Sequence, residues 1–435
     1  MTEKKGSNLK RILANTGWML FDKVFILILN LVVTVRIANY YGTLGYGTYQ
    51  YAVSVVALFE VLVTFVDARV VKKRYTTENP EELVWNATIT RLLFSVLSLI
   101  GGVVYLLFCG EKGDYHAIFF ILLVNAILIN LRFGMQNRYE YLLKSKKVIV
   151  ASNIALTIGG VLQLVAVSLR LSILTIAVIT AFSSLLSLTI VYIQYRKEFG
   201  RLIQGRFKKE LVFGLVRESL PLAIAASCAI IYSRCDSIMI GNMLSKEEVG
   251  VYAIAVKLIL VVQIGITPIR ESVYPKLIEL YGTDRKQYED RYVQITSILT
   301  WVYIVGVSAS FVVLPFAFRY LKPEYAEAFP IYQVYVIGSF FMYNAGLRAG
   351  HYTLINRGNV LMYSQIISVI LNVVLNYVLI KYIGVFGAAI ATGITQGVSL
   401  FASNLLFGKT GIEVFKWQLK GLNPMYIFKN ARNAH

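Results

Sequence analysis

Long apolar runs recur along the whole chain and constrain its fold more than any other feature. Each run has about 20 residues, enough for one helix to cross the roughly 30 Å hydrocarbon core of a membrane. Of the 435 residues, 57% are hydrophobic, and the mean hydropathy is +0.62. The sequence therefore predicts an all-α integral membrane protein with twelve transmembrane helices. The expected spans are 12–36, 47–67, 84–108, 116–136, 148–168, 171–195, 219–243, 250–274, 293–318, 329–350, 361–381 and 384–408.

The basic residues are distributed unevenly between the loops. Lysine and arginine outnumber aspartate and glutamate by 43 to 24, which gives a formal net charge of +19. If the N-terminus is cytoplasmic, most of these cations fall in inner loops and in the tail, as the positive-inside rule requires. The distribution predicts a multi-pass protein of the cytoplasmic (inner) membrane with both termini in the cytoplasm. It also indicates attraction to anionic lipid and no nucleic-acid partner.

The chain divides into two halves of six spans each. The opening "MTEKKGSNLKRILANTGW" leads into a span too long for a signal-peptide core, so we expect a retained first helix. The halves are joined by "RKEFGRLIQGRFKKELVFGLVRES" (196–219), whose basic, helically spaced apolar pattern predicts an amphipathic helix at the inner interface. The predicted regions are an N-terminal lobe (1–195), a cytoplasmic amphipathic linker (196–218), a C-terminal lobe (219–408) and a basic cytoplasmic tail (409–435).

Two pairs of segments resemble each other across the halves. "GYGTYQYAVSV" (45–55) enters span 2 as "EVGVYAIAVKL" (248–258) enters span 8, with Gly47 matching Gly250. A weaker pair is "YLLKSKKVIVASNI" (141–154) and "TLINRGNVLMYSQI" (353–366). Each half has an even number of spans, so the repeats would be parallel, an architecture typical of secondary transporters. The alternative is a chance similarity of two glycine-tyrosine segments.

Three stretches carry a family resemblance. They are "RIANYYGTLGYGTYQYAVSVV" (36–56), "RCDSIMIGNMLSKEEVGVYAIAVKL" (234–258) and "LNVVLNYVLIKYIGVFGAAIATGITQ" (371–396). On these motifs and the twelve spans, the chain resembles the Wzx-type oligosaccharide flippases of the multidrug, oligosaccharidyl-lipid and polysaccharide exporter superfamily. One departure is Lys381, where relatives often have proline, and it puts only the local turn in doubt.

The resemblance implies a fold and a function. The fold is a V-shaped pair of six-helix lobes around a central cavity lined by spans 1, 2, 7 and 8. The function is translocation of undecaprenyl- or other polyprenyl-pyrophosphate-linked oligosaccharide units from the inner to the outer leaflet, for O-antigen or other surface polysaccharide assembly. The expected partners are this substrate, membrane lipids, and a polymerase with other polysaccharide-assembly proteins.

Several rival functions remain open. A multidrug exporter of the same superfamily is the main alternative, and a lipid II flippase is the third. A membrane polymerase or acyltransferase would need a long outer loop with catalytic groups, and the outer loops here are short. No nucleotide-binding glycine loop is present in the sequence, so we expect a secondary transporter coupled to H⁺, Na⁺ or the membrane potential, with no other cofactor. His116, His351 and His435 lack metal-ligand spacing, so no metal site is expected.

Cations inside the spans are candidates for binding an anionic substrate. Ionisable groups at membrane depth are costly unless they face a cavity or a partner, although long cations near a span end can snorkel to the interface. Snorkelling accounts for Arg91 and Arg132, and the same explanation competes with a cavity role for some of the others. Guanidinium and ammonium groups suit pyrophosphate or acidic sugar. The substrate-binding candidates are Lys23, Arg234, Lys257, Arg270 and Arg36.

Carboxylates in the same spans are candidates for ion coupling. Arg234 and Asp236 are two helical positions apart, or roughly 200° around the axis, so they cannot pair directly. The candidates are Asp22, Glu60 and Asp236. The alternative for Asp22 and Glu60 is that each only neutralises a nearby lysine or arginine. For Arg234 and Asp236 the alternative is a structural inter-helix ion pair. Near the first outer turn, an aromatic belt is the expected role of Tyr40, Tyr41, Tyr46, Tyr49 and Tyr51.

Overall fold

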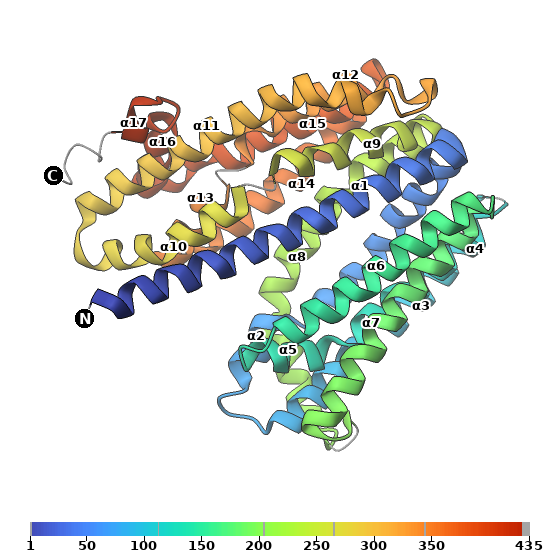
Figure 1. The fold of residues 1–435 in the computed structure, drawn as a ribbon, viewed down its shortest axis with the longest axis horizontal. Helices are drawn as coiled ribbons and strands as arrows, with labels where there is room; N and C mark the ends of the chain where they lie inside the picture. Colours follow the sequence, from blue (N-terminus) through green and yellow to red (C-terminus); the bar gives the residue numbers. More distant parts are fainter. Residues whose placement is uncertain (1, 112, 203–204, 264–265, 343–344, 429–435) are drawn as a thin grey trace. The chain divides into compact units, whose positions relative to one another are not determined.

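A computed structural model gives the fold of the chain (Figure 1). It describes residues 2–111, 113–202, 205–263, 266–342 and 345–428, and in these ranges it describes all side chains except those of residues 2–23, 260–261, 263, 266–272 and 275. Every regular element in the described ranges is helical. The all-α class predicted from the apolar runs is confirmed.

The described chain forms two compact units, and α1 and α9 contribute to both. The central unit comprises Arg36–Gly250, and the terminal unit comprises the residues before 36 and after 250. These are packing units, and the lobe boundaries expected from the repeats stay a prediction.

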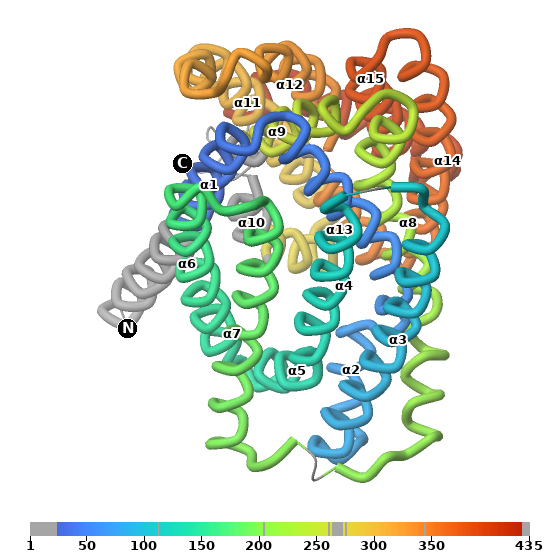
Figure 2. Tube along the Cα trace, turned by 90° about the vertical axis from the view of Figure 1, so that its right-hand side faces the viewer, coloured from blue at the N-terminus to red at the C-terminus, as the bar shows by residue number. Residues whose placement is uncertain are grey.

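The central unit is built from long helices joined by short turns. Four of them, α3, α4, α6 and α7, pack side by side (Figure 2). Its elements are α1 (Thr2–Glu60), η1 (Val61–Phe65), α2 (Ala68–Arg74), α3 (Pro80–Phe108), α4 (Tyr115–Leu131), α5 (Phe133–Tyr141), α6 (Lys146–Ser168), α7 (Ile173–Phe199), α8 (Lys209–Met243) and the start of α9 (Lys246–Gln263).

The terminal unit is less regular. Within it α15 packs on α12 and α14, and α11 packs on α10, α12 and α16. Its elements after α9 are α10 (Ile266–Thr283), α11 (Arg285–Phe318), η3 (Pro323–Tyr325), α12 (Ala328–Gly338), η4 (Ser339–Phe341), α13 (Ala345–Leu354), α14 (Gly358–Ile383), α15 (Val385–Gln396), the π-helical η5 (Gly397–Phe401), η6 (Ala402–Phe407), α16 (Gly408–Lys420) and α17 (Met425–Phe428).

Among the described residues, nine helical stretches are long and apolar enough to span a membrane. Spans 1 and 2 fall in one continuous helix, kinked where Gly42 adopts φ 72°, ψ 179°, so together they appear as one stretch. Spans 8 and 10 are each interrupted at residues outside the described ranges. The chain is a multi-pass membrane protein, and the count of twelve spans stays a prediction.

Local sequence signals set several helix boundaries. In "ENPEE", the Asn79 side chain accepts hydrogen bonds from the backbone N–H groups of Glu81 and Glu82 at 2.9 and 3.4 Å, and Pro80 occupies the first turn of α3. The side chain of Asp284 caps α11 in the same way by accepting from the N–H of Gln287 at 3.0 Å. Such caps satisfy backbone donors that a helix start leaves unpaired.

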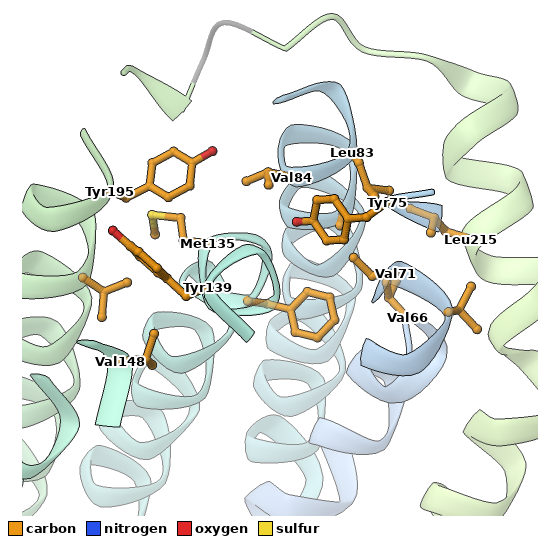
Figure 3. Packing of buried hydrophobic residues seen from close by; sticks show 14 of the residues in the cluster. Val66, Val71, Tyr75, Leu83, Val84, Met135, Tyr139, Val148, Tyr195 and Leu215 are labelled. Atoms are coloured by element: carbon orange, nitrogen blue, oxygen red, sulfur yellow. The ribbon is translucent and has the colours of Figure 1, made fainter. Parts of the chain in front are cut away.

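One end of the central unit is closed by an apolar cluster (Figure 3). Valine and leucine side chains from α2, α3 and α8 meet aromatic rings from α5 and α7 there, and Leu83, Val84 and Leu215 are fully buried. Tyr75 stacks on Tyr141 with ring centroids 4.7 Å apart. Burial of this kind stabilises the unit by about 25 cal/mol per Å² of apolar surface.

The structure corrects the expectation for the linker. The segment 196–218 is not one amphipathic helix, because α7 ends at Phe199, Gly200 adopts φ 88°, and α8 begins at Lys209. Such a backbone conformation is readily available only to glycine, so Gly200 ends the helix. In the tail, α16 is amphipathic: Trp417 is buried in the terminal unit and Lys416 is exposed.

The second repeat pair stays a prediction, although a similar turn follows α5 and α13. Leu143 and Asn356 both have φ near +57°, at 56° and 57°. In the matching turns the N–H of Lys144 donates to Tyr139 O, and the N–H of Arg357 donates to Tyr352 O, each at 2.8 Å. In these turns Leu143 takes the position of Asn356, whereas the sequence pairing places it opposite Ile355. The same turn ends α6, where Arg170 has φ 57° and the N–H of Leu171 donates to Ala166 O at 3.0 Å, so the turn is not specific to the repeat. These are the same helix-ending turn in both halves.

Candidate functional site

Polar side chains of α1, η1 and α8 meet along one line inside the central unit. We call this line the α1–α8 seam. It joins Tyr51 to Asn242, Glu60 to Arg234, Thr64 to Ser227, and the backbone of Asp67 to Ser219. As the residue number rises on α1 and η1 it falls on α8, so the two segments run antiparallel.

Three of the four seam pairs are joined by hydrogen bonds. The Tyr51 hydroxyl donates to Asn242 Oδ1 at 2.8 Å, and the Asp67 N–H donates to Ser219 Oγ at 2.9 Å. The Thr64 and Ser227 hydroxyl oxygens lie 3.5 Å apart. Because water is scarce at membrane depth, such contacts favour one alignment of the two segments.

The remaining pair consists of opposite charges that interact electrostatically without a direct hydrogen bond. Glu60 and Arg234 are both partly buried and interact electrostatically. In the part of the chain that the structure describes, no oxygen accepts a hydrogen bond from the Arg234 guanidinium. A guanidinium has five N–H donors, so Arg234 keeps its donors available while a carboxylate lies near enough to stabilise its charge.

Arg234 and Asp236 differ in their surroundings, as their spacing on α8 requires. Arg234 is partly exposed, whereas Asp236 is 7% exposed. The Cys235 thiol donates a weak hydrogen bond to Asp236 Oδ1 at 3.6 Å. The two charges therefore occupy different environments on one continuous helix.

The other predicted site residues lie elsewhere or outside the described side chains. In the terminal unit, Lys257 Nζ on α9 donates to Thr34 Oγ1 on α1 at 3.1 Å. Arg36 is exposed on α1, six positions before the Gly42 kink. The side chains of Asp22, Lys23 and Arg270 lie outside the described residues.

Sequence reasoning missed the hydroxyl and amide members of the seam. Ser219, Ser227, Arg234 and Asn242 recur every seven or eight residues along α8, which keeps them within roughly 140° of one another around the helix axis. Glu60, Thr64 and Asp67 recur at three- to four-residue spacing. The signal was present, but attention to charged residues alone overlooked it.

Two arginines predicted to snorkel instead bind protein groups in the central unit. Arg91 donates from Nε and Nη2 to the carbonyl of Val66 at 3.2 and 2.7 Å, and from Nη1 to Asn130 Oδ1 at 2.8 Å. Arg132 Nη1 donates to Ser152 Oγ at 3.0 Å and to Ser187 Oγ at 2.6 Å. Both arginines therefore join neighbouring helices.

The tyrosines near the Gly42 kink are mostly packing residues. Tyr46 and Tyr51 are 1% and 2% exposed, so the aromatic-belt interpretation is wrong for them. The Tyr41 hydroxyl donates to the carbonyl oxygens of Leu171 and Ser172 at 2.9 and 3.1 Å, at the turn between α6 and α7. Tyr40 remains 37% exposed, as a belt residue would be.

Comparisons with solved structures identify the fold. The chain is similar to an inward-facing multidrug resistance MATE family transporter of the MOP superfamily, with TM-score 0.68, 13% identity, and 96% of this chain and 100% of that chain covered. It is similar to the lipid II flippase MurJ in an inward closed conformation, with TM-score 0.71, 14% identity, and 95% and 92% covered. A third similar structure is a MOP superfamily transporter from Pyrococcus furiosus, described as having a binding pocket of reverse polarity, with TM-score 0.55, 15% identity, and 91% and 94% covered.

These neighbours are transporters or flippases, not enzymes, and at such low identities the similarity establishes the helical fold alone. No curated protein sequence matched the chain. A family model for polysaccharide biosynthesis proteins matches residues 12–281. Since this match covers more than half of the chain, the protein belongs to the polysaccharide biosynthesis protein family.

Proposed function

We propose that the protein is a flippase for polyprenyl-pyrophosphate-linked oligosaccharide, which it moves from the cytoplasmic to the outer leaflet by alternating access. The family membership supports a role in polysaccharide assembly, and the fold supports a transporter. The observation that carries the substrate class is Arg234. Its guanidinium has no hydrogen-bond acceptor among the described residues, and it lies in the membrane-embedded α1–α8 seam beside a single interacting carboxylate, Glu60.

The chemistry of this pair suits a pyrophosphate group. Phosphate oxygens are strong acceptors, and a guanidinium binds two of them at once in a planar, bidentate geometry. The Glu60 carboxylate offsets part of the cost of burying the Arg234 charge in the empty protein, because a buried cation without a counter-charge is costly. When the pyrophosphate engages Arg234, the electrostatic interaction with Glu60 is weakened.

The same exchange gives Glu60 a role in coupling. A carboxylate that loses its cationic partner in a low-dielectric site takes up H⁺ or Na⁺ to remain neutralised. We propose that substrate and coupling ion are linked at this pair in that way. Asp22 and Asp236 stay further candidates for the coupling path.

The test uses protein reconstituted in vesicles that contain fluorescent lipid-linked oligosaccharide. A membrane-impermeant quencher then reports the fraction of the lipid in the outer leaflet. The proposal expects exchange of the pyrophosphate-linked lipid and no transport of an organic dye cation. Transport of the cation without lipid exchange would instead identify a multidrug exporter, and the flippase proposal would fail.

A further inference from the structure

The last described part of the chain folds back on α11 as a helical hairpin in the terminal unit (Figure 1). In it α16 packs along α11, and α17 follows after a short turn. Arg285 Nη2 pairs with Glu413 Oε2 at 3.3 Å, and further along both helices the ring centroids of Tyr292 and Trp417 lie 5.0 Å apart. Residue numbers rise together along the two helices, so α16 runs in the same direction as α11. We call residues 408–428 the tail hairpin.

The turn of the tail hairpin is bound by side chains of α11, which is long and apolar enough to span the membrane. The Trp301 indole N–H donates to the carbonyl of Leu422 at 3.2 Å, and the Ser297 hydroxyl donates to the carbonyl of Asn423 at 2.9 Å. Position 301 lies about 12 Å along the helix from residue 293, where its predicted span begins. The predicted topology places that end of the span at the cytoplasmic side. Together these positions put the turn at the depth of the inner leaflet.

A glycine brings this turn close to α11. A Cβ added at Gly421 would lie 2.2 Å from Thr296 Cγ2 and 3.3 Å from Ser297 N, so a larger residue would push the turn away. On the returning segment, Gln294 Nε2 donates to the carbonyl of Ile427 at 2.9 Å. The tail hairpin is therefore docked on α11 both at its turn and at α17.

The exposed face of the tail hairpin is apolar and basic. Leu419, Met425 and Phe428 are 44%, 75% and 69% exposed. Lys416, one turn before Leu419, and Lys420, directly after it, are exposed as well. No carboxylate among the described residues forms an ion pair with either lysine. This combination is typical of a helix in the membrane interface, where apolar side chains enter the acyl boundary and lysines extend to the phosphates.

The composition of this face decides which occupant suits it. In water, Met425 and Phe428 would leave an apolar patch uncovered, which soluble surfaces rarely do. Hydrocarbon alone would leave Lys416 and Lys420 without a counter-charge beside an apolar phase. The inner leaflet supplies both kinds of partner, because its acidic lipids attract basic groups that lie close to the membrane.

We propose that the tail hairpin is a binding surface for the acidic phospholipids of the inner leaflet. Met425 and Phe428 insert among the acyl chains, and Lys416 and Lys420 bind the headgroup phosphates. This surface is separate from the α1–α8 seam and goes beyond the proposed flippase function.

The first test measures the depth of the turn. A nitroxide spin label replaces Met425 in a background where Cys109, Cys228 and Cys235 are serine, and the protein is reconstituted in vesicles of phosphatidylcholine and phosphatidylglycerol. The label is expected to collide more with oxygen, which concentrates in hydrocarbon, than with a water-soluble nickel complex. The control label replaces Glu279 on α10, which is 60% exposed in a predicted inner loop, and should show the opposite preference. A label at position 425 that prefers the nickel complex would overturn the proposal.

The second test measures preference for the acidic headgroup. A fluorophore on a cysteine at position 425 is quenched by phosphatidylglycerol or by phosphatidylcholine, each carrying a nitroxide on its acyl chain and present at the same mole fraction. Phosphatidylglycerol should quench more, with an association constant higher by about five-fold for each lysine that it contacts. Lys416→Gln combined with Lys420→Gln should remove most of this preference. The matched control combines Lys197→Gln with Lys209→Gln, two exposed lysines of the central unit, and should keep the preference at the same net charge.

Two results of the second test would contradict the proposal. Equal quenching by the two lipids would show contact with acyl chains only. An equal loss of preference in both double variants would show a response to net charge without a site. Neither test requires lipid-linked oligosaccharide, so failure of the proposed flippase function would leave the result for the tail hairpin unchanged.

Discussion

Arg91→Met is expected to destabilise the protein although the residue is far from any substrate role. The chain breaks its helix between η1 and α2, where Val66 is extended and Asp67 caps the next helix. The Val66 carbonyl accepts both of its side-chain hydrogen bonds from Arg91. In a membrane-spanning segment little water is available to donate a hydrogen bond to such a carbonyl, so loss of its donors in the protein destabilises the fold.

The magnitude follows from the contacts that the substitution removes. Arg91 makes three charge-assisted hydrogen bonds and places its guanidinium carbon 3.6 Å from the centroid of the Phe133 ring. Hydrogen bonds to charged groups contribute about 1.5–3 kcal/mol each in soluble proteins, but inter-helix bonds in membranes average nearer 0.6 kcal/mol. Methionine also removes the cost of burying a charge. The expected net loss in the free energy of unfolding is therefore about 2–4 kcal/mol.

The assay is reversible unfolding in mixed micelles with increasing denaturing detergent. The control is Arg69→Met, because Arg69 pairs with Asp67 while its own side chain is 68% exposed, and exposed pairs contribute about 0–1 kcal/mol. If the free energy of unfolding of Arg91→Met lies within about 0.5 kcal/mol of that of the unsubstituted protein, the carbonyl-binding role of Arg91 is refuted.

Two further predictions concern the terminal unit. Burial, and secondarily the charge of Arg285, lowers the pKa of His351 to about 4, so the unfolded chain binds the proton more tightly. Stability should therefore be fully present above about pH 6.5 and fall by on the order of 3 kcal/mol as the pH drops toward 4, and His351→Phe should flatten this slope in a melting series. At Gly411 an added Cβ would lie 2.0 Å from Asn404 O, so Gly411→Ala should lower the melting temperature measurably, while Gly358→Ala, with nothing within 4 Å, should leave it unchanged.

The sequence was sufficient for the features that depend on local pattern. The apolar runs predicted the helices, and "ENPEE" and Asp284 mark caps that the structure contains. The Gly47 and Gly250 motifs were predicted to be a repeat from the matching residues alone, and this stays a prediction. In each case the physical cause is local in the sequence. The thickness of the membrane sets the length of an apolar run, unpaired backbone donors favour a cap at a helix start, and glycine allows a turn at its own position.

Features that depend on partners distant in the sequence could not be predicted in this way. Snorkelling was a reasonable expectation for Arg91, because nothing near it in the sequence reveals that the Val66 carbonyl is left without a helical donor. The interaction of Glu60 with Arg234 crosses more than 170 positions of the chain. Gly200 is itself a signal for the end of a helix, but apolar residues at helical spacing on both sides of it led to the prediction of one continuous helix.

The central claim is that Arg234 binds the pyrophosphate group during translocation, and the most direct measurement compares lipid exchange by three proteins in vesicles. These are the unsubstituted protein, Arg234→Ala, and Arg217→Ala, an exposed arginine on the same helix α8. Loss of one charge-assisted contact predicts that Arg234→Ala exchanges lipid-linked oligosaccharide about ten-fold or more slowly, while Arg217→Ala matches the unsubstituted protein. Equal exchange by all three folded proteins would contradict the account.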